Sequence, residues 1–226
     1  MASKPVPPPP RPRLYLATPV TEDPAMLVAS LPELLAKADI AAVLLRLKMT
    51  DQRTLISRIK ALVPVVQPNG AALLIEGHAE LVARSGADGA HIAGIEALPD
   101  AMDSLKPDWI SGVGQLPTRH DSMAAGGAGV GYVLFGEPDA QGERPSMEAI
   151  AERLHWWAEL FEPPCVGYAA SLEEAREFAA SGADFVLVGD FIWADPRGAT
   201  AALMDAELAI RQGYAAMLNK AKAEQE

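Results

Sequence analysis

Short apolar runs alternate along this chain with longer stretches of mixed polar and apolar residues, and the pattern is clearest towards the C-terminal end. Residues 185–188 read Phe-Val-Leu-Val, a continuous apolar run typical of a parallel strand covered on both faces. Residues 173–180, which precede it, are rich in good helix formers. Gly182 between them can supply the positive φ that closes a helix. The pattern predicts a helix, a glycine turn and a buried strand.

The same order of features occurs twice earlier in the chain. Residues 81–94 read Leu-Val-Ala-Arg-Ser-Gly-Ala-Asp-Gly-Ala-His-Ile-Ala-Gly, and residues 124–136 hold a weaker copy. Between and around the three copies there is room for further units. This spacing indicates a chain built by repeating a βα unit.

Eight strand–helix pairs can be placed in this way. The predicted strands are residues 14–17, 40–47, 71–75, 89–92, 109–113, 130–135, 165–168 and 185–188. The predicted helices are residues 24–37, 51–62, 79–84, 98–105, 119–125, 146–160, 171–180 and 200–220. Asp51 and Ser171 are the expected N-caps of two of them, with Glu174 at the capping-box position of the second.

This count favours a single-domain (β/α)8 TIM barrel over residues 13–226, near the lower end of the size range for that fold. The competing fold is an open doubly wound sheet, which normally carries a glycine-rich phosphate loop after its first strand. Residues 18–21 here read Thr-Pro-Val-Thr, without glycine, so the barrel is preferred. The proline-rich residues 1–12 predict a disordered leader, with an SH3-type ligand as the alternative.

Composition and charge narrow the function further. The net charge of −11 and the pI near 4.8 argue against a general nucleic-acid or anionic-membrane binder. The single cysteine, Cys165, excludes an internal disulfide and fits a reducing cytosol. No apolar run approaches the roughly 20 residues that span a bilayer. We expect a cytoplasmic protein that binds neither nucleic acid nor membrane, and the sequence leaves a homo-oligomer open.

Two cations at the end of the second predicted strand are the strongest chemical signal. Function in a TIM barrel belongs to the carboxyl ends of the strands. Alternation along the strand puts Leu44, Arg46 and Lys48 on one face and Leu45 and Leu47 on the other. The face with Leu45 and Leu47 must meet the helices, so both cations are expected to point into the mouth of the barrel. They would suit a phosphate or diphosphate, which arginine can grip in a bidentate manner. An internal ion pair with Glu76, at the end of the third strand, is the alternative.

Five segments, taken in order, carry a resemblance to known proteins. They are Leu-Tyr-Leu-Ala-Thr at 14–18, Leu-Leu-Arg-Leu-Lys at 44–48, residues 73–81, Gly-Ala-Asp-Gly-Ala-His-Ile at 86–92, and Gly-Ala-Asp-Phe-Val-Leu-Val at 182–188. In the order and spacing of these segments, the chain resembles the thiamine phosphate synthase/TenI family over most of residues 13–195.

The resemblance implies a reaction and a set of ligands. The synthases of the family join a hydroxymethylpyrimidine diphosphate to a thiazole phosphate and release diphosphate, with Mg²⁺ bound. Arg46 and Lys48 match the pair that holds the diphosphate. His91 matches a histidine on the fourth strand, and Gly189 keeps the backbone open beside the final phosphate position. A small phosphorylated heterocycle is the implied partner, and Mg²⁺ the implied cofactor.

The metal ligands depart from the family pattern. The metal-binding Asp after the third strand falls on Gly77, next to Glu76. The second falls near Glu96, across a length change of one residue. Glu76 and Glu96 are therefore the candidate metal ligands, and a carboxylate–histidine site of these two with His78 is an alternative.

The phosphate cradle departs as well. The Thr-Lys-rich loop after the sixth strand is replaced by residues 137–144, and the Gly-Gly after the seventh by Ala169 and Ala170. The Ser after the eighth strand is Asp190, whose negative charge would repel a phosphate. The sequence thus supports two hypotheses: a thiamine phosphate synthase-like protein of thiamine biosynthesis with a degenerate active site, or a non-catalytic barrel, a pseudoenzyme, that serves as a binding or regulatory module.

Overall fold

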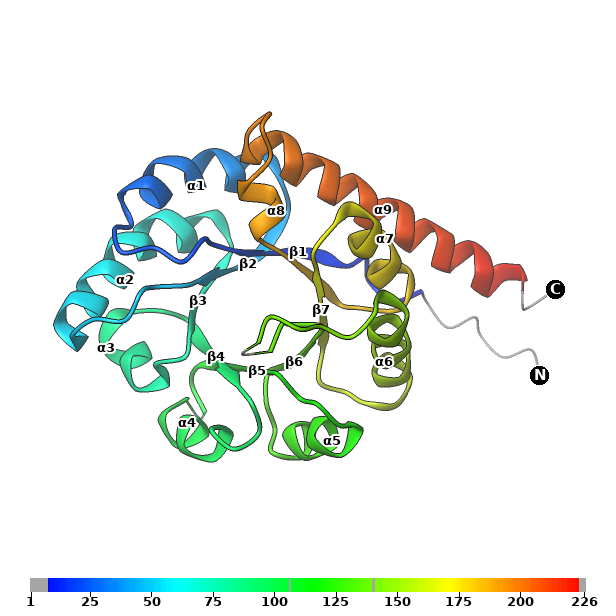
Figure 1. Ribbon diagram of the computed structural model, residues 1–226, viewed down its shortest axis with the longest axis horizontal. Helices are drawn as coiled ribbons and strands as arrows, with labels where there is room; N and C mark the ends of the chain where they lie inside the picture. Colours follow the sequence, from blue (N-terminus) through cyan, green and yellow to red (C-terminus); the bar gives the residue numbers. More distant parts are fainter. Residues whose placement is uncertain (1–7, 106, 140, 224–226) are drawn as a thin grey trace.

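The structure, a computed structural model, describes residues 8–105, 107–139 and 141–223, and its eight parallel strands close into a barrel (Figure 1). β1 pairs with both β2 and β8, so the sheet is closed. The strands are β1 (Arg13–Ala17), β2 (Ile40–Leu45), β3 (Ala72–Glu76), β4 (Gly89–Ala93), β5 (Ile110–Gly114), β6 (Tyr132–Phe135), β7 (Cys165–Ala169) and β8 (Phe185–Val188). The predicted TIM barrel is confirmed.

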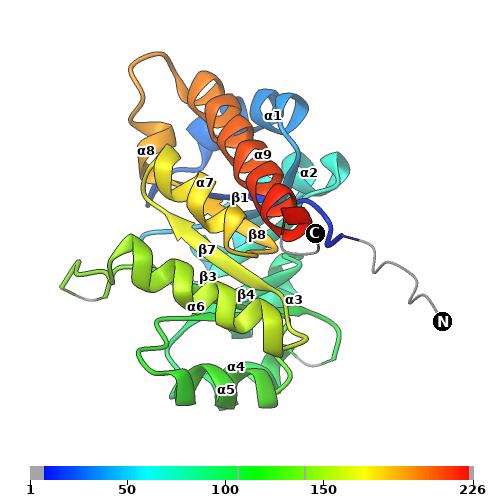
Figure 2. The ribbon, with the colours of Figure 1, turned by 90° about the vertical axis from the view of Figure 1, so that its right-hand side faces the viewer.

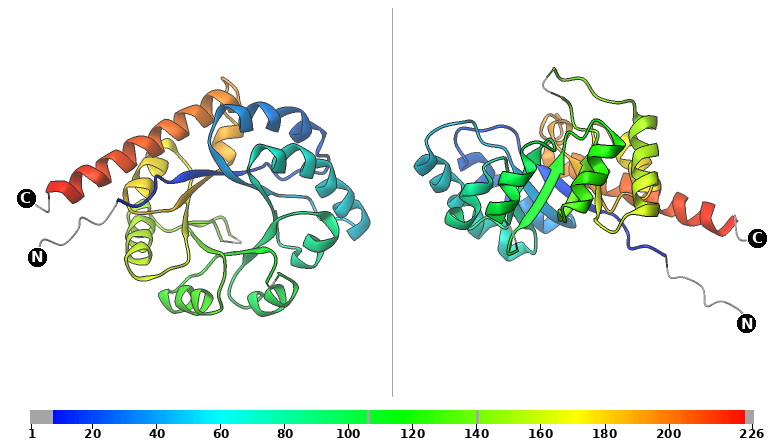
Figure 3. Two further views of the ribbon diagram at one scale, coloured as in Figure 1. Left: turned by 180° about the vertical axis from the view of Figure 1, so that it is seen from behind. Right: turned by 90° about the horizontal axis from the view of Figure 1, so that it is seen from below.

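Helices surround the barrel and follow the strands along the chain (Figures 1 and 3). The α-helices are α1 (Ala25–Lys37), α2 (Gln52–Val66), α3 (Val82–Ser85), α4 (Leu98–Leu105), α5 (Arg119–Gly127), α6 (Met147–Leu160), α7 (Leu172–Ala180), α8 (Asp190–Trp193) and α9 (Ala199–Ala223); η1 (Gln67–Asn69) and η2 (Ala79–Leu81) are 3₁₀ turns. In the described part of the chain, no helix is both long and apolar enough to cross a bilayer.

The core has two layers, as the alternation of strand side chains requires. A large apolar cluster lies between the strands and the helices, and a smaller one fills the barrel interior. The interior cluster includes Tyr15, Leu44, Tyr132 and Leu187. Two tyrosine hydroxyls therefore lie inside the barrel and need hydrogen-bonding partners there.

The repeated Gly-Ala-Asp segments set the register at the amino ends of the strands. Asp88 Oδ2 accepts a hydrogen bond from the backbone N–H of Leu73 at 2.7 Å, and Asp184 Oδ2 accepts one from Cys165 N–H at 2.8 Å. In both copies, an Asp just before one strand accepts a hydrogen bond from a backbone N–H at the start of the neighbouring strand. The sequence repeat therefore reflects a repeated structural function at the face opposite the mouth.

Several element boundaries differ from the prediction. β2 ends at Leu45, because the backbone N–H of Arg46 bonds to the Thr18 hydroxyl at 3.0 Å instead of continuing the ladder. β6 begins at Tyr132, two residues later than predicted. The short helix α8 was not predicted; Trp193 at its end donates from Nε1 to the Ala17 carbonyl at 2.8 Å.

The last helix lies alongside α7 and beside the first described residues (Figure 2). Gly213 permits this approach, since a Cβ there would lie 2.0 Å from the Arg176 carbonyl oxygen. Tyr214 donates to the Pro9 carbonyl at 2.6 Å, and Arg11 lies 3.6 Å from Asp39. The predicted disorder of the leader falls, for residues 1–7, outside the described residues.

Candidate functional site

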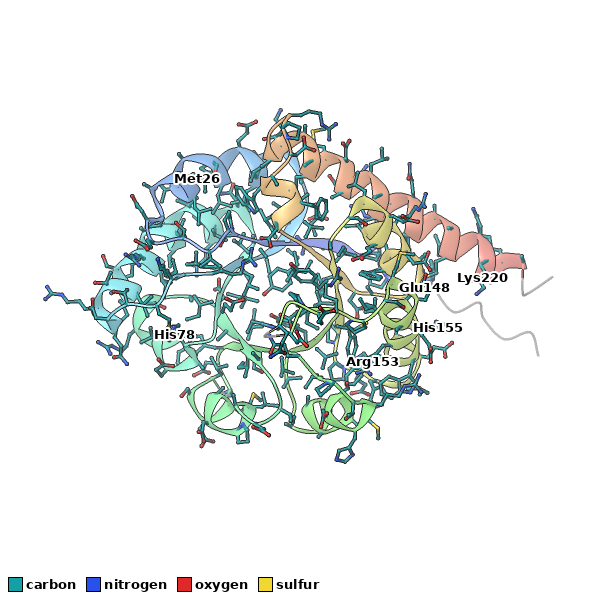
Figure 4. All side chains as sticks on the ribbon, viewed as in Figure 1. Met26, His78, Glu148, Arg153, His155 and Lys220 are labelled. Carbon is teal, nitrogen blue, oxygen red and sulfur yellow. The ribbon has the colours of Figure 1, made fainter. Side chains whose placement is uncertain are left out.

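The mouth of the barrel, at the carboxyl ends of the strands, gathers most of the predicted site residues. Arg46 follows β2, Glu76 ends β3, His91 lies on β4, and Gly189 and Asp190 follow β8. Figure 4 shows the side chains; Arg153 on α6 and His78 beyond β3 lie on opposite sides of the barrel. Closure of the sheet brings together residues that are far apart in the sequence.

Arg46 is the cation held in the mouth. Its side chain is 14% exposed; Nε donates to the Thr18 carbonyl and Nη2 donates to the Asp190 carboxylate. Gly189 lies close to it: a Cβ there would be 3.9 Å from Arg46 Nη2 and only 3.2 Å from the Ala17 Cβ. The ion-pair partner of Arg46 is therefore Asp190, whereas the sequence alternative named Glu76.

Lys48 lies apart from Arg46. Its side chain is 66% exposed, and Nζ donates to Glu22 in the segment between β1 and α1. The structure thus brings Arg46 and Asp190 together and places Lys48 in a separate, solvent-exposed ion pair. A common grip of the two cations on one ligand stays a prediction.

The candidate metal ligands Glu76 and Glu96 are both exposed residues. Partial desolvation of the Glu76 carboxyl group raises its pKa, whereas the positive charges of Arg46 and His91 act to lower it. His78 is the third residue of the alternative site. Its Nδ1 lies 3.5 Å from Glu80 Oε1, and its Nε2 lies 3.1 Å from Met49 Sδ.

The resemblance implies a bound Mg²⁺, so these residues can be tested for fit. Within the described ranges, no group of three His, Cys, Asp or Glu side chains lies close enough together to hold a metal ion. Since Mg²⁺ is usually held by one or two carboxylates together with substrate phosphates, Glu76 and Glu96 as metal ligands stay a prediction.

His91 belongs to a hydrogen-bonded chain that runs from the barrel interior to the mouth. Tyr15 and Tyr132 hydroxyls are 2.9 Å apart, and Tyr132 lies 2.9 Å from His91 Nδ1. On the other side, His91 Nε2 lies 3.0 Å from Glu137 Oε1, and Glu137 Oε2 accepts from Gln115 N–H at 3.0 Å. Both ring nitrogens of His91 thus have protein partners.

Two glycines of β5 make room for this chain. A Cβ at Gly112 would lie 1.9 Å from the Tyr132 ring, and a Cβ at Gly114 would lie 1.6 Å from Glu137 Oε2. Glycine at these two inward positions is therefore required by the side chains opposite.

Three side chains of this hydrogen-bonded chain, Tyr15, His91 and Tyr132, have shifted pKa values. Burial alone would lower the pKa of His91, but the Glu137 carboxylate beside it, with a contribution from Glu76, raises it overall. Burial also raises the pKa values of Tyr15 and Tyr132 far above the ordinary tyrosine range, so both stay neutral hydrogen-bonding groups.

A second arginine lies at the mouth and was not among the predicted site residues. Arg144, in the segment after β6, donates to the carbonyls of Gly136 at 2.6 Å and Tyr168 at 2.7 Å. It also pairs with Glu174 at 3.0 Å, both side chains being 18% exposed, and lies 5.1 Å from the centre of the Tyr168 ring.

Glu174 also differs from its predicted role. Its Oε2 accepts from the backbone N–H of Ala170 at 2.8 Å, instead of completing the expected capping box with Ser171. The backbone N–H of Ala170, after β7, therefore donates to a carboxylate of the protein itself, at the position where the resemblance placed the phosphate cradle. Arg144 supplies its counter-charge.

A cavity of about 500 Å³ opens beside the Arg144 loop. Its polar lining comprises Gln115, the carboxylates of Glu137, Asp139 and Glu143, and the guanidinium groups of Arg144 and Arg153; its apolar lining includes Leu134, Phe135 and Ile150. Arg153 donates to the carbonyls of Leu116 at 2.9 Å and Pro117 at 3.1 Å. The mouth can thus accommodate a molecule with apolar and polar parts next to the guanidinium groups.

A closed parallel barrel with polar strand-end residues around its mouth is the arrangement that carries the active sites of TIM-barrel enzymes. The family model described as thiamine monophosphate synthase matches residues 14–192. The chain belongs to the thiamine monophosphate synthase family.

Curated relatives agree with this membership. Thiamine-phosphate synthase of Rhodospirillum centenum is 37% identical over 197 residues, which cover 85% of this chain and 95% of the relative. Thiamine-phosphate synthase of Hyphomonas neptunium is 35% identical over 206 residues, covering 87% of this chain and 92% of that protein. The relatives and the family indicate thiamine phosphate synthase function.

Solved structures share the fold. The thiamine phosphate pyrophosphorylase of Pyrococcus furiosus superposes with a TM-score of 0.73 at 19% identity, covering 89% of this chain and 96% of the other. The 3-hexulose-6-phosphate synthase of Salmonella typhimurium superposes with a TM-score of 0.67 at 13% identity, covering 89% and 99%. At these identities the similarity shows the barrel architecture alone.

Proposed function

We propose that the chain acts in thiamine biosynthesis as a thiamine phosphate synthase-like enzyme. It joins hydroxymethylpyrimidine diphosphate to thiazole phosphate and releases diphosphate. The observation that carries the proposal is Arg46, a mostly buried guanidinium at the mouth of a barrel of this family. Its Nε is fixed by the Thr18 carbonyl, so its orientation is set before a ligand arrives.

The chemistry requires a cation at the leaving group. As diphosphate departs, negative charge builds up on its oxygens, and a preoriented guanidinium stabilises that charge more in the transition state than in the ground state. Arg46 supplies this interaction, and the cavity beside Arg144 accommodates the heterocycle. The proposed ligands are small phosphorylated heterocycles.

The proposed place of action is the cytoplasm. Cys165 is a free thiol in the buried core, and burial raises its pKa to about 12, so it stays protonated and unreactive. A lone buried thiol fits a reducing compartment. Fractionation of cells expressing the chain would test this assignment.

Replacing Arg46 tests the proposal. Arg46→Ala should lower kcat/KM for thiamine phosphate formation by about 100- to 1000-fold, because the leaving group loses its fixed cation. Lys48→Ala should lower it by less than about tenfold, since Lys48 lies in an exposed ion pair. The assay is product formation from the two substrates, alongside rescue of a thiamine-auxotrophic strain.

The same assay decides against the proposal. A wild-type protein that forms no thiamine phosphate and rescues no auxotroph would leave the non-catalytic barrel as the function. An active enzyme that tolerates Arg46→Ala would show that another group carries the diphosphate.

A further inference from the structure

Two of the guanidinium groups at the mouth are already engaged by carboxylates of the chain itself. Arg46 donates to Asp190, and Arg144 donates to Glu174. An incoming anion must therefore compete with an internal carboxylate for the same N–H groups. The two pairs can be compared by how readily each one opens.

The Arg144–Glu174 pair is built into the fold. Both side chains are 18% exposed, and each has further backbone partners: Gly136 and Tyr168 for Arg144, and Ala170 for Glu174. Opening the pair would leave a partly buried charge without its partner, which is costly. This pair is unsuited to exchange with a ligand.

The Arg46–Asp190 pair differs on the carboxylate side. The Asp190 side chain is 71% exposed, and Arg46 is its partner among the described residues. A carboxylate in this position can turn into water at small cost, because water replaces the hydrogen bond it loses. Arg46 stays in place, since its Nε remains bonded to the Thr18 carbonyl.

We propose that Asp190 is a displaceable internal competitor for Arg46. In the substrate-free protein the Asp190 carboxylate accepts a hydrogen bond from the Arg46 guanidinium, and it gives up this bond when the diphosphate end of the substrate binds. The inference rests on the proposed function in taking Arg46 as the anion site. Asp190 then acts as a specificity determinant: a single carboxylate offers Arg46 nothing that Asp190 does not, whereas a diphosphate brings more charge and more acceptor oxygens.

The other carboxylates at the mouth act in the same direction. Glu76 interacts through space with both Arg46 and Asp190, and Glu137 adds a further negative charge. With Asp190 present, carboxylates outnumber the one guanidinium that can exchange its partner. Neutralising Asp190 removes both the direct competitor and one repulsive charge.

The test measures binding of sodium diphosphate to the full-length protein by isothermal titration calorimetry at fixed ionic strength. Asp190→Asn keeps the size of the side chain and removes its charge, and it should bind diphosphate on the order of tenfold more tightly than the wild type. Asp190→Ser is a second variant, expected to give the same gain. Both should let acetate compete with diphosphate, which it should not do in the wild type.

Glu152→Gln is the matched control. Glu152 is 73% exposed and pairs with Arg119 at 2.7 Å, so the substitution changes the net charge equally and opens a similar ion pair outside the mouth. It should bind diphosphate as the wild type does. In an Arg46→Gln background, the gain from Asp190→Asn should disappear, because the competition requires the guanidinium.

The outcomes separate this inference from the function on which it rests. Equal binding by the wild type and both Asp190 variants overturns the competition and leaves Arg46 as the anion site. A gain that persists with Arg46→Gln overturns it too, because the effect would then be general electrostatics. Binding by none of the proteins overturns the competition and the proposed anion site together.

Discussion

At the scale of single residues, the mouth is organised by charges that pair across long stretches of sequence. Arg46 and Asp190 are 144 residues apart, and His91 and Glu137 are 46 apart. Arg46 is 14% exposed and Asp190 71%, so the guanidinium is held while the exposed carboxylate can respond to ligand or solvent. The His91–Glu137 pair, in which the pKa of His91 is raised, shows how such pairing affects stability.

The raised pKa of His91 predicts a pH dependence of the free energy of unfolding. The folded state binds the His91 proton more tightly than the unfolded state, so the stabilisation is complete below the ordinary histidine pKa, near 6.5, and is lost as pH rises through the raised value. Urea unfolding across pH 6 to 9 would measure this decline, and an NMR titration of the imidazole would follow the proton directly.

Glu137→Gln is the companion variant for this experiment. It preserves hydrogen-bonding capacity towards His91 and Gln115 but removes the charge that raises the pKa. We expect a loss of about 1 kcal/mol at pH 6 and a flatter dependence of stability on pH. A decline as steep as that of the wild type would assign the effect to another group.

Residue chemistry at the mouth was only partly predictable. Arg46 was found because strand alternation and the barrel rule point to it. Arg144 was missed because its segment, rich in Pro, Gly and acidic residues, is typical of a solvated loop. Glu174 was assigned to a capping box, since local spacing carries no information about the Ala170 amide and the distant guanidinium that bind it.

At the scale of elements, the Arg144 contacts join the end of β6, the end of β7 and the start of α7. One guanidinium bonds to the Gly136 and Tyr168 carbonyls and to the Glu174 carboxylate. It therefore links carbonyls at the ends of two strands to a carboxylate of the helix that follows β7. A loop that reads as solvated thus fixes the relative positions of three elements.

Removing this guanidinium should destabilise the protein. Arg144→Ala leaves the Glu174 carboxylate without its partner and is expected to lower the free energy of unfolding by about 1–3 kcal/mol. Arg119→Ala, which opens the exposed pair with Glu152, should cost less than about 1 kcal/mol. Urea denaturation of both variants gives the comparison, and equal losses would show that the Arg144 contacts contribute no more than a surface ion pair.

Element prediction succeeded where apolar runs and glycine turns mark the boundaries. β8 and α4 were predicted to the residue, and for β8 the signals were Gly182 and the apolar run that follows it. α8 was missed because a four-residue helix has too short a pattern to detect, and it is held by a long-range bond from Trp193 to Ala17.

At the scale of the whole molecule, the decisive feature is closure of the sheet. Pairing of β1 with β8 places Thr18, which follows β1, next to Asp190, which follows β8, with Arg46 between them. The repeated βα unit predicted the number of strands and hence closure, but not the order of charge pairs around the mouth. The site follows from fold and pairing together.

The most direct test of the account is a crystal structure of the protein with diphosphate bound. We predict a diphosphate at the mouth that accepts hydrogen bonds from the Arg46 guanidinium, with the Asp190 carboxylate turned away into solvent and the Arg144–Glu174 pair unchanged. A structure at saturating diphosphate in which Arg46 still pairs with Asp190, and the anion lies elsewhere, would contradict it.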